Sequence, residues 1–457
     1  MKWDVIVVGA GIAGLGVGAI LTKEKGLKVL VLDRYPRPGG RLMTATDYPE
    51  PGWTVDVGLH FVELADEGES HQLNARVGRR VEWGPDSRSV KIYRDGAWLD
   101  IAKLLHLSED DQAGFKALTG LIVGLGDEEI AAWDGRSFEE WMERHAAPGA
   151  IRDLLSAFAM IMTTIPRPVD MAAGEVLYIA RQNLLKKRRF LAAGYPVGGM
   201  KALTRGLVET IEEGGGEVRS ASPVEEVELR DGRAVGVVAA TGRGPYPNDY
   251  NVNFTERFES RAVVCALPIY QLEGLLDFSA LPSWWRRRIR EIRNEVTGLV
   301  GYLLGLREPL TEEHCFYSVM ETPVGRRPFQ GFPASNFDPT IAPPGRQLFH
   351  TDLVVEYEEA ADPILRRRFL DLLWRDLQEM FPGIEAGILW KLPYFVAGCD
   401  GLARKPGLVG RFKPELKAPG IRNLYFAGDT YQGRGLAINS AARSAMDAAD
   451  LIMSEWK

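Results

Sequence analysis

Two glycine-rich segments near opposite ends of the chain contain the residues best suited to hold a nucleotide. The first segment has the spacing GxGxxG at Gly9, Gly11 and Gly14, directly after an apolar run typical of a buried strand. In such a turn Gly9 permits a tight bend, Gly11 lets the backbone approach a pyrophosphate, and Gly14 lets the next helix pack on the sheet. The segment therefore predicts a dinucleotide-binding strand–helix–strand unit.

An acidic residue and a second pair of glycines follow in the order that such a unit requires. Residues 29–32 form another apolar run, which we expect to be a strand that delivers Asp33 to the ribose hydroxyls. A carboxylate there favours FAD or NAD over NADP. Gly40 permits close backbone approach, and Arg41 supplies a cation that can fork onto a phosphate oxygen. The predicted cofactor contacts of this half are Gly9, Gly11, Ile12, Ala13, Gly14, Asp33, Arg34, Gly40, Arg41 and Leu42.

The order of motifs along the chain resembles one group of flavoproteins. The N-terminal pattern continues into Asp56-Val57-Gly58-Leu59-His60, and Tyr425-Phe426-Ala427-Gly428-Asp429 stands near the C-terminus. Together they resemble the two signatures of the amine oxidase and phytoene desaturase group, within the glutathione-reductase-like FAD superfamily. The resemblance covers both ends of the chain well and the middle poorly. It implies that the dinucleotide is FAD.

The same resemblance assigns roles to residues in the second half of the chain. Asp429 is implied to bind the ribityl chain or the pyrophosphate. The helix from about Leu436 is implied to point its first amides at the flavin N1/C2=O edge, where its dipole stabilises the anionic reduced flavin. Val224 is implied to bracket the adenine, with an ordinary strand residue as the open alternative. The predicted contacts of this half are Val224, Ala266, Gly428, Asp429, Gly435, Leu436, Ala437 and Ile438.

The expected fold is α/β, because a Rossmann-type FAD-binding domain must be assembled from discontinuous segments. A chain of 457 residues is long for one core, and two intertwined domains are expected. We assign residues 1–90, 191–275 and 396–457 to the FAD-binding domain. Residues 91–190 and 276–395 should form an α+β substrate-binding domain, which includes a helix with Asp362 as N-cap and Pro363 at its first position.

Composition narrows the class of protein further. The net charge of −7 argues against nucleic acid as a partner. The three cysteines contain no CxxC pair, which excludes a dithiol redox motif and a cysteine-rich metal site and suits a reducing cytoplasm. The apolar N-terminus mimics a secretory signal, but Asp4 interrupts it. We expect a cytoplasmic protein without a metal site.

Catalytic side chains are harder to identify than cofactor contacts. His60 lies in the loop that this group places near the flavin and could act as an acid or base, although a histidine outside the site is an equal alternative. Tyr195 could line the entrance of the pocket, but a packed loop tyrosine is the favoured interpretation. Cys399 has nearly the spacing of the cysteine that monoamine oxidases couple to the flavin. Because Asp400 follows it, we expect FAD to be held non-covalently.

The electron path follows from what the chain lacks. No second GxGxxG follows a strand, so electrons should come from an organic substrate and leave to oxygen, a quinone or another acceptor. By alignment, Asp400 and Leu436 stand where amine oxidases keep two cage tyrosines, and Gly301 stands where they keep a lysine. We therefore expect desaturation, dehydrogenation or isomerisation of an apolar or cyclic molecule. A flavin amine oxidase is the second hypothesis, and a lipid escort protein of the same fold is the third.

A basic cluster leaves a membrane interaction open. Arg286 to Arg293 follow Trp284 and Trp285, and four basic residues stand at 186–189. One interpretation is a helix that docks on a membrane carrying a lipophilic substrate. The favoured interpretation is a solvated helix face with tryptophan packed inward.

Overall fold

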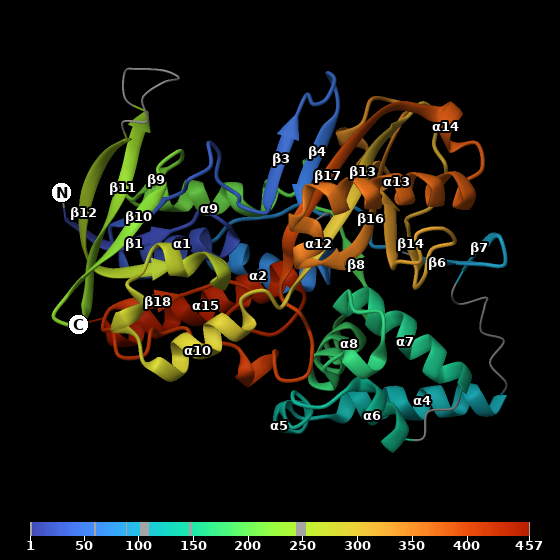
Figure 1. The fold of residues 1–457 in the computed structure, drawn as a ribbon, viewed down its shortest axis with the longest axis horizontal. Helices are drawn as coiled ribbons and strands as arrows, with labels where there is room; N and C mark the ends of the chain where they lie inside the picture. The colour runs from blue at the N-terminus through green and yellow to red at the C-terminus, as the bar shows by residue number, and fades with distance from the viewer. Residues whose placement is uncertain are drawn as a thin grey trace.

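The computed structural model describes residues 2–58, 61–87, 89–100, 109–145, 149–243 and 253–456. Two seven-stranded sheets lie next to each other, and a group of helices gathers beneath the second sheet in the view of Figure 1. Both ends of the described chain lie beside the first sheet (Figure 1). The predicted α/β fold class is confirmed.

The first sheet contains the predicted nucleotide-binding strands. β1 (Lys2–Val8) pairs in parallel with its neighbours on both sides, and its apolar residues are fully buried. In spatial order the strands are β10 (Val224–Arg230), β11 (Arg233–Arg243), β12 (Asn253–Cys265), β1, β2 (Val29–Leu32) and β9 (Glu217–Arg219), and β18 (Leu424–Phe426) pairs with β12. The C-terminal signature therefore lies one strand away from the N-terminal one.

Three helices cover this sheet, and one glycine sets how closely the first of them approaches. α1 (Ile12–Lys25) ends at Gly26, whose φ of 63° is left-handed, as the sequence predicts. It packs against α9 (Ala202–Glu213) and α15 (Ala437–Glu455). A Cβ on Gly14 would collide with the carbonyl oxygen of Gly9 and lie 3.0 Å from the Cβ of Ala266. Only glycine permits this packing.

The second sheet is mostly antiparallel and is built from the central part of the chain. In spatial order its strands are β17 (Ile388–Leu402), β13 (Val296–Leu306), β16 (Gln347–Glu356), β15 (Phe329–Pro333), β14 (Cys315–Val319), β6 (Ser89–Arg94) and β7 (Ala97–Asp100). The proposed domain boundary at 395/396 falls inside β17, which belongs wholly to this sheet. The division into two domains stays a prediction.

The helices around the second sheet fall into two groups (Figure 1). One group, beneath the sheet, comprises α4 (Glu109–Gly124), α5 (Asp127–Ala131), α6 (Phe138–Arg144), α7 (Gly149–Thr163) and α8 (Ala173–Lys187). The other contains α12 (Tyr357–Ala361) and α13 (Pro363–Met380). As predicted, Asp362 caps α13, and its Oδ1 accepts hydrogen bonds from the backbone of Ile364 at 2.7 Å and Leu365 at 3.1 Å.

Shorter elements connect these layers. They are β3 (Leu42–Thr46), β4 (Thr54–Gly58), β5 (Val62–Glu63), β8 (Ala193–Gly194), α2 (Glu69–Arg76), α10 (Ser283–Ile292), α11 (Ala334–Phe337) and α14 (Ile384–Gly387). Within the described ranges, no helix combines the length and the apolar character needed to cross a bilayer.

Candidate active site

A cavity of about 630 Å³ lies where the two ends of the chain meet. It is lined by all of the predicted cofactor residues except Gly14, Gly435 and Leu436. Gly14 acts instead in helix packing, and Leu436 lines an adjoining cavity. Segments that are far apart in the sequence, from Val8 to Ala441, therefore line one cavity, as a discontinuous dinucleotide site requires.

The Gly9–Gly14 turn shapes one wall of this cavity. Gly9 has a φ of 104°, and an added Cβ would lie 2.8 Å from the carbonyl oxygen of Ala266. Gly11 has an ordinary φ of −76°, and an added Cβ would meet no described atom within 4 Å. That Cβ would occupy the cavity itself. α1 begins at the next residue, so its first amides are available to an anion in this space.

The Asp33 carboxylate is fixed by the backbone around it. Its Oδ2 accepts a hydrogen bond from Ala10 N at 2.6 Å, and its Oδ1 accepts one from Tyr35 N at 2.7 Å. Each oxygen keeps a further lone pair. The carboxylate lines the cavity and can therefore accept hydrogen bonds from the hydroxyl groups of a ribose without changing its own contacts.

Arg41 joins the two ends of the chain rather than pointing freely at a phosphate. Its Nη2 donates to both carboxylate oxygens of Asp429, at 2.6 and 2.7 Å. Its Nη1 donates to the carbonyl oxygens of Gly398 at 3.0 Å and Cys399 at 2.7 Å. The expectation of an Arg41–phosphate fork is thereby revised, because both terminal nitrogens already have protein acceptors.

The turn before α15 is held by residues of the helical group. Glu175 of α8 accepts a hydrogen bond from Gly435 N at 2.9 Å. The buried Lys413 donates to the carbonyl oxygen of Gly433 at 2.9 Å. Arg434 pairs with the fully buried Asp134 at 2.6 Å. Gly435 thus positions the start of α15 and does not itself line the large cavity.

The two catalytic candidates proposed from sequence are not placed in the site. His60 lies outside the described residues. Tyr195 is fully buried, and its hydroxyl donates to Asp56, which also accepts from Met200 N at 3.0 Å. Burial raises the pKa of Asp56 to about 6. These contacts agree with the favoured interpretation of Tyr195 as a packed loop tyrosine, whose hydroxyl anchors the loop at 194–200 to the β3–β4 hairpin.

A second, smaller cavity of about 60 Å³ adjoins the first and shares Ala437 and Ile438 with it. Its walls are mainly aromatic and aliphatic. Apolar side chains from both halves of the molecule line it: Phe61, Val62, Ile161, Leu299, Phe316, Phe332 and Leu436. Three carboxyl groups also line it, from Glu63, Asp352 and Asp400. The two positions that alignment places at an amine cage, Asp400 and Leu436, both border this space.

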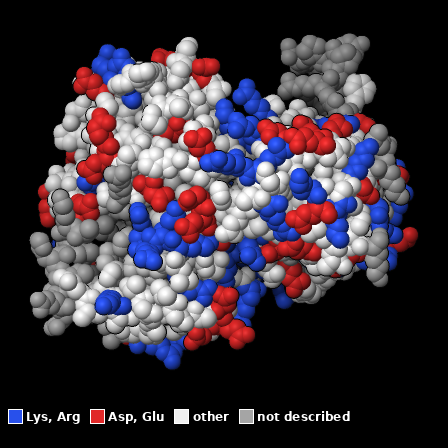
Figure 2. All heavy atoms as spheres, turned by 180° about the vertical axis from the view of Figure 1, so that it is seen from behind, with Lys and Arg blue, Asp and Glu red and all other residues white. Residues whose placement is uncertain are grey.

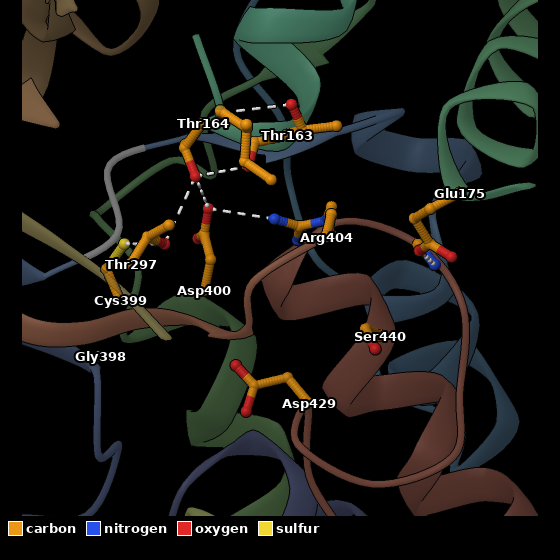
Figure 3. A network of polar contacts seen from close by, with 12 residues as sticks. Thr163, Thr164, Glu175, Thr297, Gly398, Cys399, Asp400, Arg404, Asp429 and Ser440 are labelled. Atoms are coloured by element: carbon orange, nitrogen blue, oxygen red, sulfur yellow. Dashed lines mark hydrogen bonds and ion pairs between the residues drawn. The ribbon is translucent and has the colours of Figure 1, made fainter. Parts of the chain in front are cut away.

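One of the three carboxylates has a cationic partner. Asp400 forms an ion pair with Arg404 at 3.3 Å, and both side chains are buried (Figure 3). Figure 3 also shows the Thr164 hydroxyl between Asp400 and Thr297, at 3.5 and 3.3 Å. This network fixes the end of β17 against the C-terminus of α7.

The other two carboxyl groups, of Glu63 and Asp352, are buried and form no ion pair with any residue that the structure describes. Burial, together with the charge of Glu69, raises the pKa of Glu63 to about 8. Burial, together with the charge of Asp400, raises the pKa of Asp352 to about 7. Sequence reasoning missed both residues. A signal for Asp352 did exist, because it is an acid within the apolar run of β16, where nine of the ten residues are buried.

Cys399 lines the small cavity, and not the large one. It is fully buried, its Sγ lies 3.5 Å from the Thr297 hydroxyl, and burial raises its pKa well above the usual value. Such a thiol is a poor nucleophile, because the thiolate is the reactive form.

A family comparison agrees with this arrangement. The family model described as flavin containing amine oxidoreductase matches residues 12–453. The chain belongs to this family. The resemblance stated from sequence is confirmed, and the protein is an FAD-dependent oxidoreductase. Which residues contact the FAD stays a prediction.

Curated relatives and solved structures extend over most of the chain. Prolycopene isomerase from Arabidopsis thaliana is 24% identical over 85% of this chain and 71% of its own length. A phytoene desaturase (neurosporene-forming) from Rhodobacter capsulatus is 27% identical over 51% of this chain and 48% of its own. The crystal structure of an oxidoreductase from Methanosarcina mazei superposes with a TM-score of 0.75 at 20% identity, covering 98% of this chain and 100% of that one.

The residues of the large cavity fit FAD. The cradle that a Cβ on Gly11 would fill suits a pyrophosphate, and Asp33 has free lone pairs at the place where a ribose is expected. Asp429 also lines this cavity, and Arg41 holds its carboxylate there. Bound FAD supplies two-electron redox chemistry.

We predict that two substitutions in the same turn affect different properties, flavin binding in one case and stability in the other. Gly11→Val should fold, because an added Cβ meets no described atom within 4 Å, but should purify without flavin because the side chain fills the space expected for the pyrophosphate. Gly14→Ala should lower the stability of the apoprotein by about 1–3 kcal/mol, because α1 must move away from the sheet. Flavin absorbance and denaturant unfolding measure the two effects. A Gly11→Val protein that retains flavin would show that this cavity is not the cofactor site.

We predict that Asp429→Ala weakens FAD binding by about 1–3 kcal/mol, because Arg41 loses its carboxylate partner and buried polar groups are left unpaired. Asp429→Asn should weaken it less, since the amide still accepts one hydrogen bond from Arg41. Fluorescence titration of apoprotein with FAD measures the affinity. Equal affinities for the wild type and both variants would contradict a role for Asp429 in holding the cofactor.

Proposed function

We propose that the protein oxidises, desaturates or isomerises an apolar or cyclic small molecule at a C–C or C–H bond. The observation that carries this proposal is the small, mainly aromatic cavity that adjoins the cofactor cavity. Phe316 and Phe332, whose ring centroids are 5.5 Å apart, form part of its wall. The transfer of a hydrocarbon from water into such a space is favourable, by about 25 cal/mol per Å² of apolar surface removed from water.

Relatives support this assignment. Two of them are a prolycopene isomerase and a neurosporene-forming phytoene desaturase. We propose that this chain likewise acts on an apolar molecule. Asp400 and Leu436, at positions where amine oxidases keep tyrosines, leave the small cavity without the paired aromatic rings that would orient an amine.

The residues of the site have separate roles in this proposal. Residues of the Gly9–Gly14 turn, Asp33 and Asp429 hold the FAD. The aromatic walls exclude water from the reacting bond, and Arg404 keeps the charge of Asp400 compensated beside it. Electrons leave to oxygen, a quinone or another acceptor. A lipid escort role is the least favoured hypothesis, because the cofactor cavity keeps its glycines and both acids.

Amine oxidation is the second candidate function. The family is named for it, and three carboxyl groups line the small cavity, where they could attract a cationic amine. Against it, the positions of the aromatic cage hold Asp400 and Leu436. A substrate screen separates the two hypotheses directly.

We predict that apolar cyclic or polyene compounds, and not monoamines or polyamines, bleach the bound flavin under anaerobic conditions. Bleaching is the loss of oxidised-flavin absorbance and needs no knowledge of the acceptor. Chromatography of the mixture detects isomerisation, which leaves the flavin oxidised at the end. Bleaching by amines alone would place amine oxidation first.

We also propose that FAD is bound non-covalently. Cys399 is buried, its thiol pKa is raised, and it lines the small cavity only. We predict that acid precipitation followed by filtration releases all of the flavin into the filtrate. Flavin that stays with the precipitate in the wild type, but not in Cys399→Ala, would show a thioether link.

The basic helix α10 better fits a solvated face than a membrane anchor. Trp285 is buried, and both Arg290 and Arg293 pair with Glu273. Basic and acidic side chains are also interspersed over the face of the molecule shown in Figure 2. Trp284 is 55% exposed, so a substitution at this position tests the membrane hypothesis. Sedimentation with anionic vesicles, lost in Trp284→Ala, would support membrane contact.

A further inference from the structure

A row of polar side chains crosses the second sheet in its buried interior. In the strand registers, Ser318 stands opposite Gln330, Gln330 opposite Asp352, and Asp352 opposite Gly301. Residues directly opposite each other point to the same face and have Cβ atoms about 4.5–5.5 Å apart. Tyr394 stands opposite Gly301 on its other side. The row therefore spans five adjacent strands.

Gly301 lets the row close around Asp352. A Cβ at this position would lie 2.8 Å from Tyr394 Cε1 and 2.9 Å from Asp352 Cβ. Without it, the Tyr394 hydroxyl crosses over β13 and donates to Asp352 Oδ2 at 3.2 Å. This contact fixes the carboxyl group through Oδ2, and the Tyr394 hydroxyl does not bind its other oxygen, Oδ1.

Three polar atoms of the row have no hydrogen-bond partner among the described residues, namely Ser318 Oγ, Gln330 Nε2 and Asp352 Oδ1, and the last two belong to residues that line the small cavity. Asp352 is 5% exposed, and its Oδ1 accepts and donates no hydrogen bond among the described residues; the same is true of the Gln330 side-chain Nε2. Both residues line the small cavity beside the cofactor cavity. An unpaired buried polar group costs about 1–3 kcal/mol, so a pair of them at one cavity points to a ligand group that satisfies both.

We propose that Asp352 and Gln330 form a subsite for a neutral oxygen group, a hydroxyl or a carbonyl, on an otherwise apolar substrate. The inference rests on the proposed function and adds the polar part of the substrate. A hydroxyl or carbonyl oxygen accepts a hydrogen bond from Gln330 Nε2. A hydroxyl then donates to Asp352 Oδ1, and a carbonyl accepts from the protonated form of the same oxygen.

Charged groups fit the subsite less well. An ammonium group has donors only and would leave Gln330 Nε2 unpaired. An anionic group would lie in the same cavity as Glu63, Asp352 and Asp400. The raised pKa values of Glu63, about 8, and Asp352, about 7, agree with a site that holds neutral groups near neutral pH.

The size of the cavity places the oxygen close to the reacting bond. A volume of about 60 Å³ holds roughly four water molecules, at about 15 Å³ of such volume each. It thus admits the oxygen group and the few carbon atoms next to it, and the rest of a longer molecule extends beyond this cavity. Because Ala437 and Ile438 border both cavities, the bond that reacts lies within a few atoms of the oxygen.

A matched ligand series tests the subsite on the FAD-loaded protein. The probes are geraniol, its aldehyde, the corresponding hydrocarbon and the corresponding primary amine, titrated while the flavin absorbance spectrum is recorded. Thermal unfolding of the apoprotein with the same ligands gives a second measure that does not depend on flavin. We expect the alcohol and the aldehyde to bind roughly 5- to 150-fold more tightly than the hydrocarbon.

Substitutions in the row test whether the preference for alcohol over hydrocarbon comes from Asp352 and Gln330. Asp352→Leu and Gln330→Leu should each reduce the preference for alcohol over hydrocarbon several-fold while keeping the flavin. If Asp352→Leu does not fold, Gln330→Leu carries the test alone. Thr22→Val is the control, because Thr22 Oγ1 is also buried and unpaired but lies in α1, away from both cavities. It should leave the preference unchanged.

The outcomes separate this inference from the function on which it rests. Equal binding of alcohol and hydrocarbon by the wild type, or an unchanged preference in both leucine variants, overturns the subsite and leaves an apolar substrate in place. Tightest binding by the amine overturns the subsite and favours amine oxidation. Failure of all four probes to bind, together with bleaching by other amines, overturns the proposed function itself.

Discussion

The architecture depends on the joint that Arg41 makes between three distant parts of the chain. One guanidinium group binds the carboxylate of Asp429 and the carbonyl oxygens of Gly398 and Cys399. These partners belong to the C-terminal motif and to β17, the edge strand of the second sheet. Charge-assisted and bidentate contacts are the strongest hydrogen bonds available to a side chain. The joint therefore fixes where the small cavity meets the large one.

That placement explains why β17 has two functions. It pairs with β13 from Ile388 to Ala397 and again at Leu402. Between these paired parts, Gly398 and Cys399 supply the carbonyl oxygens of the joint, and Cys399 and Asp400 line the small cavity. Gly398 and Gly401 have left-handed φ values of 80° and 71°, which turn the backbone at the point where it changes role. Asp400 is then held from the other side by Arg404 and Thr164.

The sequence predicted many of the residues that line the large cavity but few of those that line the small one, for a physical reason. Dinucleotide binding imposes requirements on neighbouring backbone positions, such as the tight turn at Gly9 and the close packing at Gly14. Such requirements produce a short motif that can be recognised in the sequence. The small cavity is assembled from one to three residues each of β5, α7, β13, β14, β15, β16, β17 and α15, and their meeting depends on the register of a whole sheet. Tyr195 is packed in its loop as favoured from sequence, but its partner Asp56 could not be identified there. Asp352 was detectable only as an acid inside an apolar strand.

The contrast between Asp400 and Asp352 gives the small cavity its chemical character. Both carboxyl groups border the same space, but Arg404 compensates only one of them, and Tyr394 offers the other a single hydrogen bond. A buried charge without a counter-ion is costly, so the uncompensated acid stays neutral until the pH reaches about 7. The small cavity therefore combines apolar walls, the Asp400–Arg404 ion pair and two acids, Glu63 and Asp352, whose pKa values are raised by burial. This combination suits a polar end on an apolar molecule better than a charged one.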